Sequence, residues 1–238
     1  MKNYQLLNFS YVVARDHPIK TIEEYGQALA AKFLSEYSHV KKVNVEITED
    51  IWDRMPVNGK PHGHSFVKAM YVRTAKVSAA RGAPAVVESG VRDLTVLKTT
   101  GSGFENFHRC RYTTLPDVAD RLFGTKIQAV WTYTPESVRG GYKSVDFNDT
   151  WNKVLALMFS TFATEYSPSV QRTIHSAGEK VVTRLAHVEN ITLTMPNIHN
   201  WSIDFTKLKL ENTPDLLIPV DEPSGFIHAT VSKPKSKM

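Results

Sequence analysis

The fold is decided by residues 21–48, TIEEYGQALAAKFLSEYSHVKKVNVEIT, where the spacing of apolar residues changes from a helical period to a strand period. Over residues 21–37 apolar side chains recur every three to four positions, which predicts an amphipathic helix. These side chains are Ile22, Tyr25, Leu29 and Phe33. Thr21 followed by Glu24 is typical of a capping box at the helix start. Apolar and polar residues then alternate over 43–48, which indicates a strand with one buried face.

Similar patterns extend to the rest of the chain. Asn58-Gly59 is typical of a two-residue hairpin turn. Strands are expected over residues 64–77, 86–99, 125–133, 190–195, 201–205 and 226–231, helices over 147–162 and 169–185, and loops over 81–85 and 135–141. This order of elements favours an α+β fold, in which helices cover one face of an antiparallel sheet.

Composition narrows the class of protein. The 238 residues are 42% hydrophobic and 22% charged, as in an ordinary globular protein with a real core. The single cysteine, Cys110, excludes an intrachain disulfide and a cysteine-based zinc cluster. The net charge of +5 is modest and spread along the chain, so it supports nucleic-acid binding only weakly.

Three motifs that often carry chemistry are incomplete here. His62 and His64 form a pair on one strand face, but no third metal ligand is evident nearby, so we expect no metal site. Cys110 has cationic neighbours that could lower the pKa of its thiol, but no motif places a base beside it. The sequence Gly101-Ser102-Gly103 lacks the full glycine pattern of a nucleotide-binding loop.

Four polar residues near apolar strands and helix starts are better candidates. Arg121 offers a planar donor fork and Gln171 an amide that both donates and accepts, which suits the edge of a flat heterocycle. Asn197 lies two residues before His199, whose imidazole titrates near neutrality and could act as a general base. Each could equally be a salt-bridged, capping or structural residue, and spacing alone does not join the four into one site.

The last three residues, Ser236, Lys237 and Met238, are a near variant of the peroxisomal address Ser-Lys-Leu. They follow a basic stretch that begins at Lys233.

Five motifs in order resemble the urate oxidase (uricase) family, and the similarity runs from about Asn8 to the C-terminus. They are LKTTGSGF at 97–104, YTTL at 112–115, Asp120-Arg121, SPSVQ at 167–171 and LTMPNIH at 193–199. Residues 58–66, 146–151 and 221–225 extend the match.

The resemblance implies two tunnelling-fold (T-fold) modules in a homotetramer around a barrel-shaped tunnel. We expect a partial first module over residues 1–82, a second over 83–232 and a targeting tail over 233–238. The family oxidises urate with molecular oxygen to 5-hydroxyisourate and hydrogen peroxide, without metal or organic cofactor. It is usually found in peroxisomes, so the resemblance also implies a peroxisomal import receptor as a partner of the C-terminal tripeptide.

The resemblance also implies roles for individual residues. Arg121 and Gln171 correspond to the pair that grips the purine anion, with help from the backbone amide of Val170. Phe104 corresponds to the ring that stacks on the purine. Asn197 corresponds to the residue that holds oxygen or water above the substrate plane, and His199 to the histidine of the proton relay.

Two members of the family's proton relay are not recognisable here: a lysine on the first strand and a threonine followed by aspartate. Asn3 and Tyr4 stand where the threonine and aspartate are expected. We therefore expect an incomplete first module with an unpaired sheet edge. An alternative function is a catalytically impaired purine-binding or assembly subunit. A pterin-handling T-fold enzyme ranks third, since such relatives usually anchor the ring with a carboxylate, whereas Gln171 stands in the uricase motif here.

Overall fold

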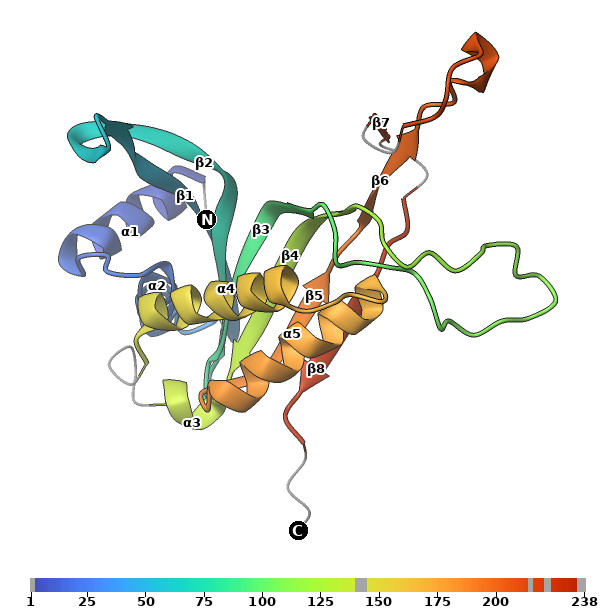
Figure 1. Cartoon of the computed structure of the whole chain (residues 1–238). Helices are drawn as coiled ribbons and strands as arrows, with labels where there is room; N and C mark the ends of the chain where they lie inside the picture. The colour runs from blue at the N-terminus through green and yellow to red at the C-terminus, as the bar shows by residue number, and fades with distance from the viewer. Residues whose placement is uncertain (1–2, 140–144, 214–215, 221–223, 235–238) are drawn as a thin grey trace.

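The computed structural model describes residues 3–139, 145–213, 216–220 and 224–234. Its strands form one antiparallel sheet in the order β1-β2-β3-β4-β5-β8, with β6 paired to β4 and β7 paired to β6 (Figure 1). The α+β prediction, an antiparallel sheet backed by helices, is therefore confirmed.

The helices are α1 (Asn3–Asp16), α2 (Ile22–Glu36), α3 (Pro135–Val138), α4 (Phe147–Thr164), α5 (Val170–Arg184) and the 3₁₀ helix η1 (Thr206–Leu208). The strands are β1 (Lys42–Val57), β2 (Lys60–Ala80), β3 (Val86–Lys98), β4 (Phe123–Tyr133), β5 (Val188–Thr194), β6 (Asn197–Ser202), β7 (Leu217–Val220) and β8 (His228–Ser232).

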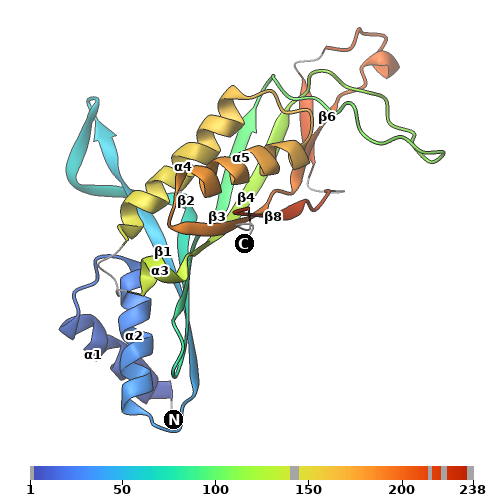
Figure 2. The same ribbon diagram turned by 90° about the horizontal axis from the view of Figure 1, so that it is seen from below.

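The predicted hairpin is present and longer than expected. Asn58 and Gly59 have φ values of 50° and 75°, the two left-handed positions that a tight hairpin turn needs. β1 and β2 pair from Lys42 opposite Ala80 to the turn, and the turn end projects beyond the helices (Figure 2). β1 is an end strand of the sheet, and among the described residues no strand pairs with its outer edge.

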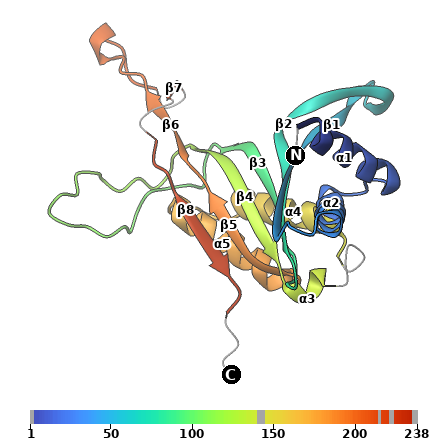
Figure 3. The ribbon, with the colours of Figure 1, turned by 180° about the vertical axis from the view of Figure 1, so that it is seen from behind.

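The helices cover one face of the sheet, while the opposite face of β4, β5 and β8 is bare of helices in Figure 3. Between the sheet and α4 and α5 lies the main core. Its fully buried side chains include Trp131, Ile191, Val154, Met158, Ile174 and Val181. Burial of each large apolar side chain contributes about 1.5–3 kcal/mol, so this layer supplies much of the stability.

A polar network joins the first part of the chain to the second within this layer. Glu23 on α2 accepts hydrogen bonds from Arg73 on β2 at 2.8 Å and from Ser89 on β3 at 2.5 Å. Arg73 also donates to Asn148 on α4 at 2.6 Å. The hydroxyl of Tyr133 on β4 lies 3.0 Å from that of Ser89. The module boundary between residues 82 and 83 stays a prediction. Both the sheet and this polar network extend across that boundary.

Side-chain caps set where the longer helices begin. The Thr21 hydroxyl accepts from the amide of Glu24 at 3.2 Å, as expected for α2. The Asp146 carboxylate caps α4 in the same way, and Ser169 caps α5 by accepting from the amide of Arg172 at 3.2 Å. The Ser169 cap places Val170 and Gln171 in the first turn of α5.

Helix α1 was not expected from the sequence, and packing accounts for it. Val13 is buried, and the ring of Phe9 lies edge-on to Phe33 of α2 with centroids 5.3 Å apart. The Tyr25 hydroxyl donates to the carbonyl of Ser10 at 2.9 Å. The helix is therefore stabilised by contacts with α2.

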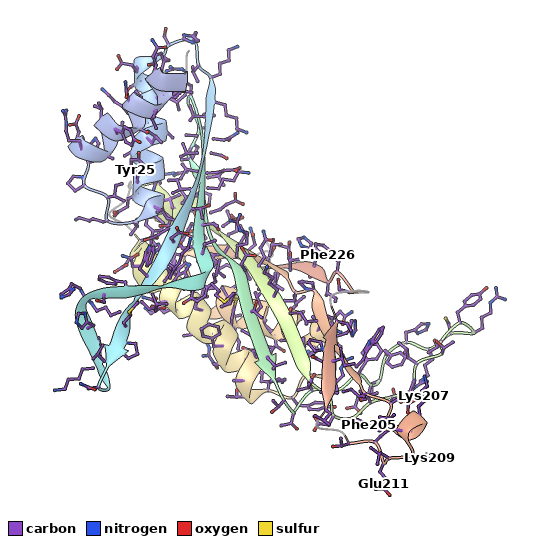
Figure 4. The ribbon with its side chains drawn as sticks, turned by 90° about the horizontal axis from the view of Figure 1, so that it is seen from above. Tyr25, Phe205, Lys207, Lys209, Glu211 and Phe226 are labelled. Carbon is purple, nitrogen blue, oxygen red and sulfur yellow. The ribbon has the colours of Figure 1, made fainter. Side chains whose placement is uncertain are left out.

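Two other expectations are wrong in detail. The predicted loop over residues 135–141 begins with the short helix α3, because Pro135 has the backbone angle suited to the first turn of a helix. The predicted strand over residues 201–205 ends at Ser202, and Asp204 accepts from the amide of Thr206 at 3.0 Å as η1 begins. Figure 4 shows Phe205, Lys207, Lys209 and Glu211 together on this segment, away from the body of the sheet.

Within the described ranges, no helix is long and apolar enough to cross a membrane. Ser236, Lys237 and Met238, the predicted targeting residues, lie outside the described residues.

Candidate functional site

A cavity of about 370 Å³ brings together the six residues that the family resemblance assigns to ligand handling. Three separate parts of the chain contribute them: the β3–β4 connection, the start of α5 and strand β6. The residues lining the cavity are Phe104, Leu115, Pro116, Val118, Arg121, Val170, Gln171, Asn197, His199, Gly225 and Ile227.

The β3–β4 connection is fastened to the segment that leads into α5. Gly103 donates its amide to the carbonyl of Ser167 at 2.8 Å, and Ser167 donates to the carbonyl of Gly101 at 3.0 Å. A side chain at position 103 has no room, since a Cβ there would collide with the Tyr166 hydroxyl and lie 2.7 Å from the Val118 carbonyl oxygen. This close approach sets Arg121 and Phe104 beside the first turn of α5.

Arg121 presents a half-buried guanidinium to the cavity. Its amide donates to the carbonyl of Ser102 at 2.7 Å, which places the backbone. Its Nε is buried and has no hydrogen-bond partner, and no ion pair with Arg121 is present among the described residues. Burial lowers the pKa of the Arg121 guanidinium from its ordinary value, yet an arginine stays protonated in proteins. A positive donor group is therefore available to a ligand.

Phe104 lies next to this guanidinium, with the Arg121 Cζ 5.2 Å from the ring centroid. Two backbone hydrogen bonds hold the phenylalanine: its amide donates to the Val118 carbonyl at 2.7 Å, and the Val118 amide donates back at 3.0 Å. The Phe107 ring stacks on it with centroids 4.4 Å apart. The aromatic wall of the cavity is thus placed by the backbone and by a second ring.

The first turn of α5 supplies Val170, which is buried, and Gln171, which is exposed. The first amides of a helix have no acceptor within the helix, so the Val170 N–H can donate to a ligand. The Gln171 side-chain amide makes no hydrogen bond to any residue in the described parts of the chain. Both groups are therefore free to bind a polar edge.

Strand β6 supplies Asn197 and His199. Alternate residues of a strand point to the same face, so both side chains can line one cavity. The Asn197 amide donates to the Gly225 carbonyl at 3.1 Å, which ties β6 to the approach to β8. The His199 ring has no hydrogen-bond partner among the residues that the structure describes.

Thr125 is a neighbour of the site that the sequence analysis missed. It lies directly opposite Asn197 in the β4–β6 pairing and is fully buried, and its hydroxyl has no hydrogen-bond partner in the part of the chain that the structure describes. Residues opposite each other on paired strands have Cβ atoms about 4.5–5.5 Å apart. Nothing in the local sequence distinguishes this threonine from any other strand threonine.

A second cavity of about 730 Å³ adjoins the first and shares Val118, Arg121, Asn197 and His199 with it. Its other lining residues are Thr99, Asp120, Leu122, Ile198, Asn200, Ser202 and Leu217.

The remaining candidates lie outside these cavities. The rings of His62 and His64 are 4.5 Å apart on the β1–β2 hairpin, and no group of three or more metal-ligating residues occurs in the described ranges. Cys110 is exposed, and the pKa of its thiol is lowered chiefly by a hydrogen bond from the Tyr112 backbone, not by the neighbouring arginines.

Several apolar residues that line the cavity were not predicted from the sequence, although two of them lie in motifs that resemble the uricase family. Leu115 belongs to the YTTL motif and Gly225 to the motif at residues 221–225, but neither was assigned a role. Val118 and Ile227 carried no signal, since only the folded chain brings them beside α5.

The model of the family described as Uricase matches residues 8–76 and 87–228. The uricase of Dictyostelium discoideum is 38% identical over 232 residues, which cover 97% of this chain and 78% of that protein. The uricase of Oryctolagus cuniculus is 37% identical, with 95% and 75% covered. The crystal structure of uricase from Arthrobacter globiformis is 28% identical with a TM-score of 0.87, and the match covers all of this chain and 79% of that one. This chain therefore belongs to the uricase family.

Proposed function

We propose that this chain is a urate oxidase that converts urate, molecular oxygen and water to 5-hydroxyisourate and hydrogen peroxide in the cavity at the start of α5. The observation that carries the proposal is the Arg121 guanidinium, half-buried and without an ion-pair partner among the described residues, in the same cavity as the free Gln171 amide. A desolvated, unpaired cation favours an anionic ligand.

The lining groups suit a flat purine anion. The guanidinium provides a planar donor fork, and Gln171 provides a donor and an acceptor for the opposite edge. Phe104 offers a ring face for stacking, and the Val170 amide offers a further donor. A volume of about 370 Å³ lies in the usual range for small-molecule sites.

The chemistry follows from holding the ionised substrate. A positive fork stabilises the electron-rich anion of urate, which is the form able to give electrons to oxygen. Two electrons pass from urate to oxygen, water adds its hydroxyl to the oxidised ring, and two protons reach the reduced oxygen. In this proposal Asn197 holds oxygen or water above the ring, and His199 carries a proton between water and peroxide. As in the family, no metal or organic cofactor is assigned a role.

The assembly proposal is a homotetramer. Large apolar side chains are exposed on the β1–β2 hairpin, with Met70 93% and Trp52 57% exposed, and Trp201 on β6 is 56% exposed. Exposed large apolar side chains are typical of sites of association, which supports assembly of the chain with copies of itself. Mass measurement by size-exclusion chromatography with light scattering tests this.

A peroxisomal location is also proposed, from the likeness of Ser236, Lys237 and Met238 to the Ser-Lys-Leu address. Replacing the three residues by alanine should abolish import of a fluorescent fusion through the peroxisomal import receptor. Unchanged import would contradict this assignment.

The activity is tested by following urate loss and peroxide release together with the purified chain. Arg121→Ala should weaken urate binding by at least about 30-fold, because the variant removes a desolvated charge-assisted contact. The matched control is Lys126→Ala, which removes an exposed cation of β4 that pairs with Asp93 at 3.0 Å. Unchanged urate affinity in Arg121→Ala would refute the proposed site.

The alternative function, a purine-binding subunit without turnover, is favoured by the His199 ring, which has no proton-relay partner among the described residues. Urate binding measured without oxygen distinguishes the two functions. Binding without peroxide release, indifferent to His199→Ala, would select the binding subunit. Peroxide release that falls in His199→Ala would select the oxidase.

A further inference from the structure

Asp120 directly precedes Arg121 and lines the adjoining cavity, yet its carboxylate forms no ion pair with the guanidinium. Both oxygens are engaged elsewhere. Oδ2 accepts from the Thr100 hydroxyl at 2.6 Å, and Oδ1 accepts from the Gly101 amide at 3.0 Å. The carboxylate is thus held against residues 100 and 101, just after the end of β3.

A backbone hydrogen bond forms a second connection between residues 100–102 and residues 120–121. The Arg121 amide donates to the Ser102 carbonyl at 2.7 Å, one residue beyond the Asp120 contacts. Gly101 has a φ of 71°, a left-handed angle that favours glycine. Its amide donates to Asp120, and its carbonyl accepts from Ser167 at 3.0 Å.

Ser167 lies three residues before Val170, so the chain of contacts from Asp120 ends at the start of α5. Arg121 and Gln171, the two halves of the proposed purine grip, are therefore connected through Asp120, Gly101 and Ser167.

We propose that Asp120 is a positioning residue for Arg121, the cation that binds the substrate: its carboxylate clamps residues 100 and 101, which sets Arg121 against Gln171 and keeps the guanidinium free for the anion. This inference rests on the proposed function. Asp120 itself touches no substrate in it. The Thr100 hydroxyl is also the main reason why the pKa of Asp120 lies below its usual value, so the carboxylate remains a double acceptor at neutral pH.

The clamp can be lost in two ways. Without the acceptor oxygens, the turn at Gly101 is no longer tied to Arg121, and a shift of about 1 Å at a positioning group can cost as much as 100-fold in rate. If only the Thr100 contact is lost, the carboxylate can turn to the neighbouring guanidinium and compete with the substrate anion.

The test measures urate dissociation constants without oxygen, and KM and kcat with oxygen, for four variants of the full chain. Asp120→Ala should raise the dissociation constant and KM by about tenfold or more with a smaller change in kcat, because the clamp acts through binding. Asp120→Asn should stay within about threefold of the parent, since its amide can accept from Gly101 and donate to Thr100. Thr100→Val should raise KM without removing a charge.

The matched control is Asp117→Ala, in the same connection. Its carboxylate pairs with Arg109 at 2.8 Å with both side chains about half exposed, so urate affinity should not change. Thermal unfolding of each variant verifies that the chain is folded, and Thr100→Val keeps the test open if Asp120→Ala does not fold.

Unchanged affinity in Asp120→Ala and Thr100→Val would overturn the inference. Equal losses in Asp120→Asn and Asp120→Ala would also overturn it, because the effect would then belong to the charge and not to the hydrogen bonds. If Arg121→Ala loses urate binding while Asp120→Ala retains it, only the positioning role fails. If Arg121→Ala retains binding, the proposed function fails.

Discussion

Replacing Glu23 by glutamine tests whether a buried ion pair ties the first part of the chain to the second. The Glu23 side chain is fully buried, and that of Arg73 is 7% exposed. Glutamine keeps the shape of the side chain but loses its charge, and its amide nitrogen faces either the donor-only Arg73 guanidinium or the Ser89 hydroxyl, which would then have to accept instead of donate. Among the described residues, Glu49, 3.8 Å from the Arg73 Nε, then remains as the carboxylate partner.

The expected loss in the free energy of unfolding follows from the burial of this ion pair. Removing one partner of a buried pair costs about 3–5 kcal/mol, because the other charge is left without compensation. For a protein of this size, each kcal/mol lowers the melting temperature by about 2–4 °C. Glu23→Gln should therefore melt about 6–20 °C below the parent.

The assay is urea and thermal unfolding followed by circular dichroism, at one protein concentration because association raises apparent stability. The control, Glu46→Gln, breaks the exposed pair with Lys76, whose atoms lie 3.3 Å apart, and should cost less than about 1 kcal/mol. Equal effects of the two substitutions would refute the reasoning. A parental chain that already unfolds in two separate steps, of which Glu23→Gln shifts only one, would show that the network does not couple the two parts.

Three further predictions concern the helices beside the site. Burial lowers the pKa of His187, whose Nε2 lies 2.8 Å from the Thr150 hydroxyl, so the folded state binds fewer protons than the unfolded state. The free energy of unfolding should therefore fall as the pH drops below about 6.5. In His187→Gln this fall should be shallower. Ser169→Ala should cost about 1 kcal/mol in unfolding and raise the urate KM, and Ser169→Asp should restore both. Gly178→Ala should destabilise the chain by about 1–3 kcal/mol, because the new Cβ would lie 2.6 Å from Val231 Cγ2, and Val231→Ala should relieve the loss.

Local sequence patterns predicted the structure correctly at positions where neighbouring residues determine the backbone conformation. The helix after Thr21 and the turn at Asn58-Gly59 appear as predicted, since a cap and two left-handed residues act within a few positions. Helix α1 shows the limit of this reasoning. Its position depends on contacts with α2, namely the Phe9 ring against Phe33 and the Tyr25 hydroxyl on the Ser10 carbonyl, which local sequence does not encode.

The candidate site shows the same division. The sequence by itself determined the family through its motifs, and from that resemblance came the proposal that Arg121, Gln171, Asn197 and His199 form the site. Only the tertiary structure decided that these side chains share one cavity, that the Asp120 carboxylate binds Thr100 and not Arg121, and that Thr125 lies opposite Asn197 on the paired strand. The physical reason is that the β3–β4 connection, α5 and β6 meet through pairing and close packing between residues tens of positions apart, which no local pattern records.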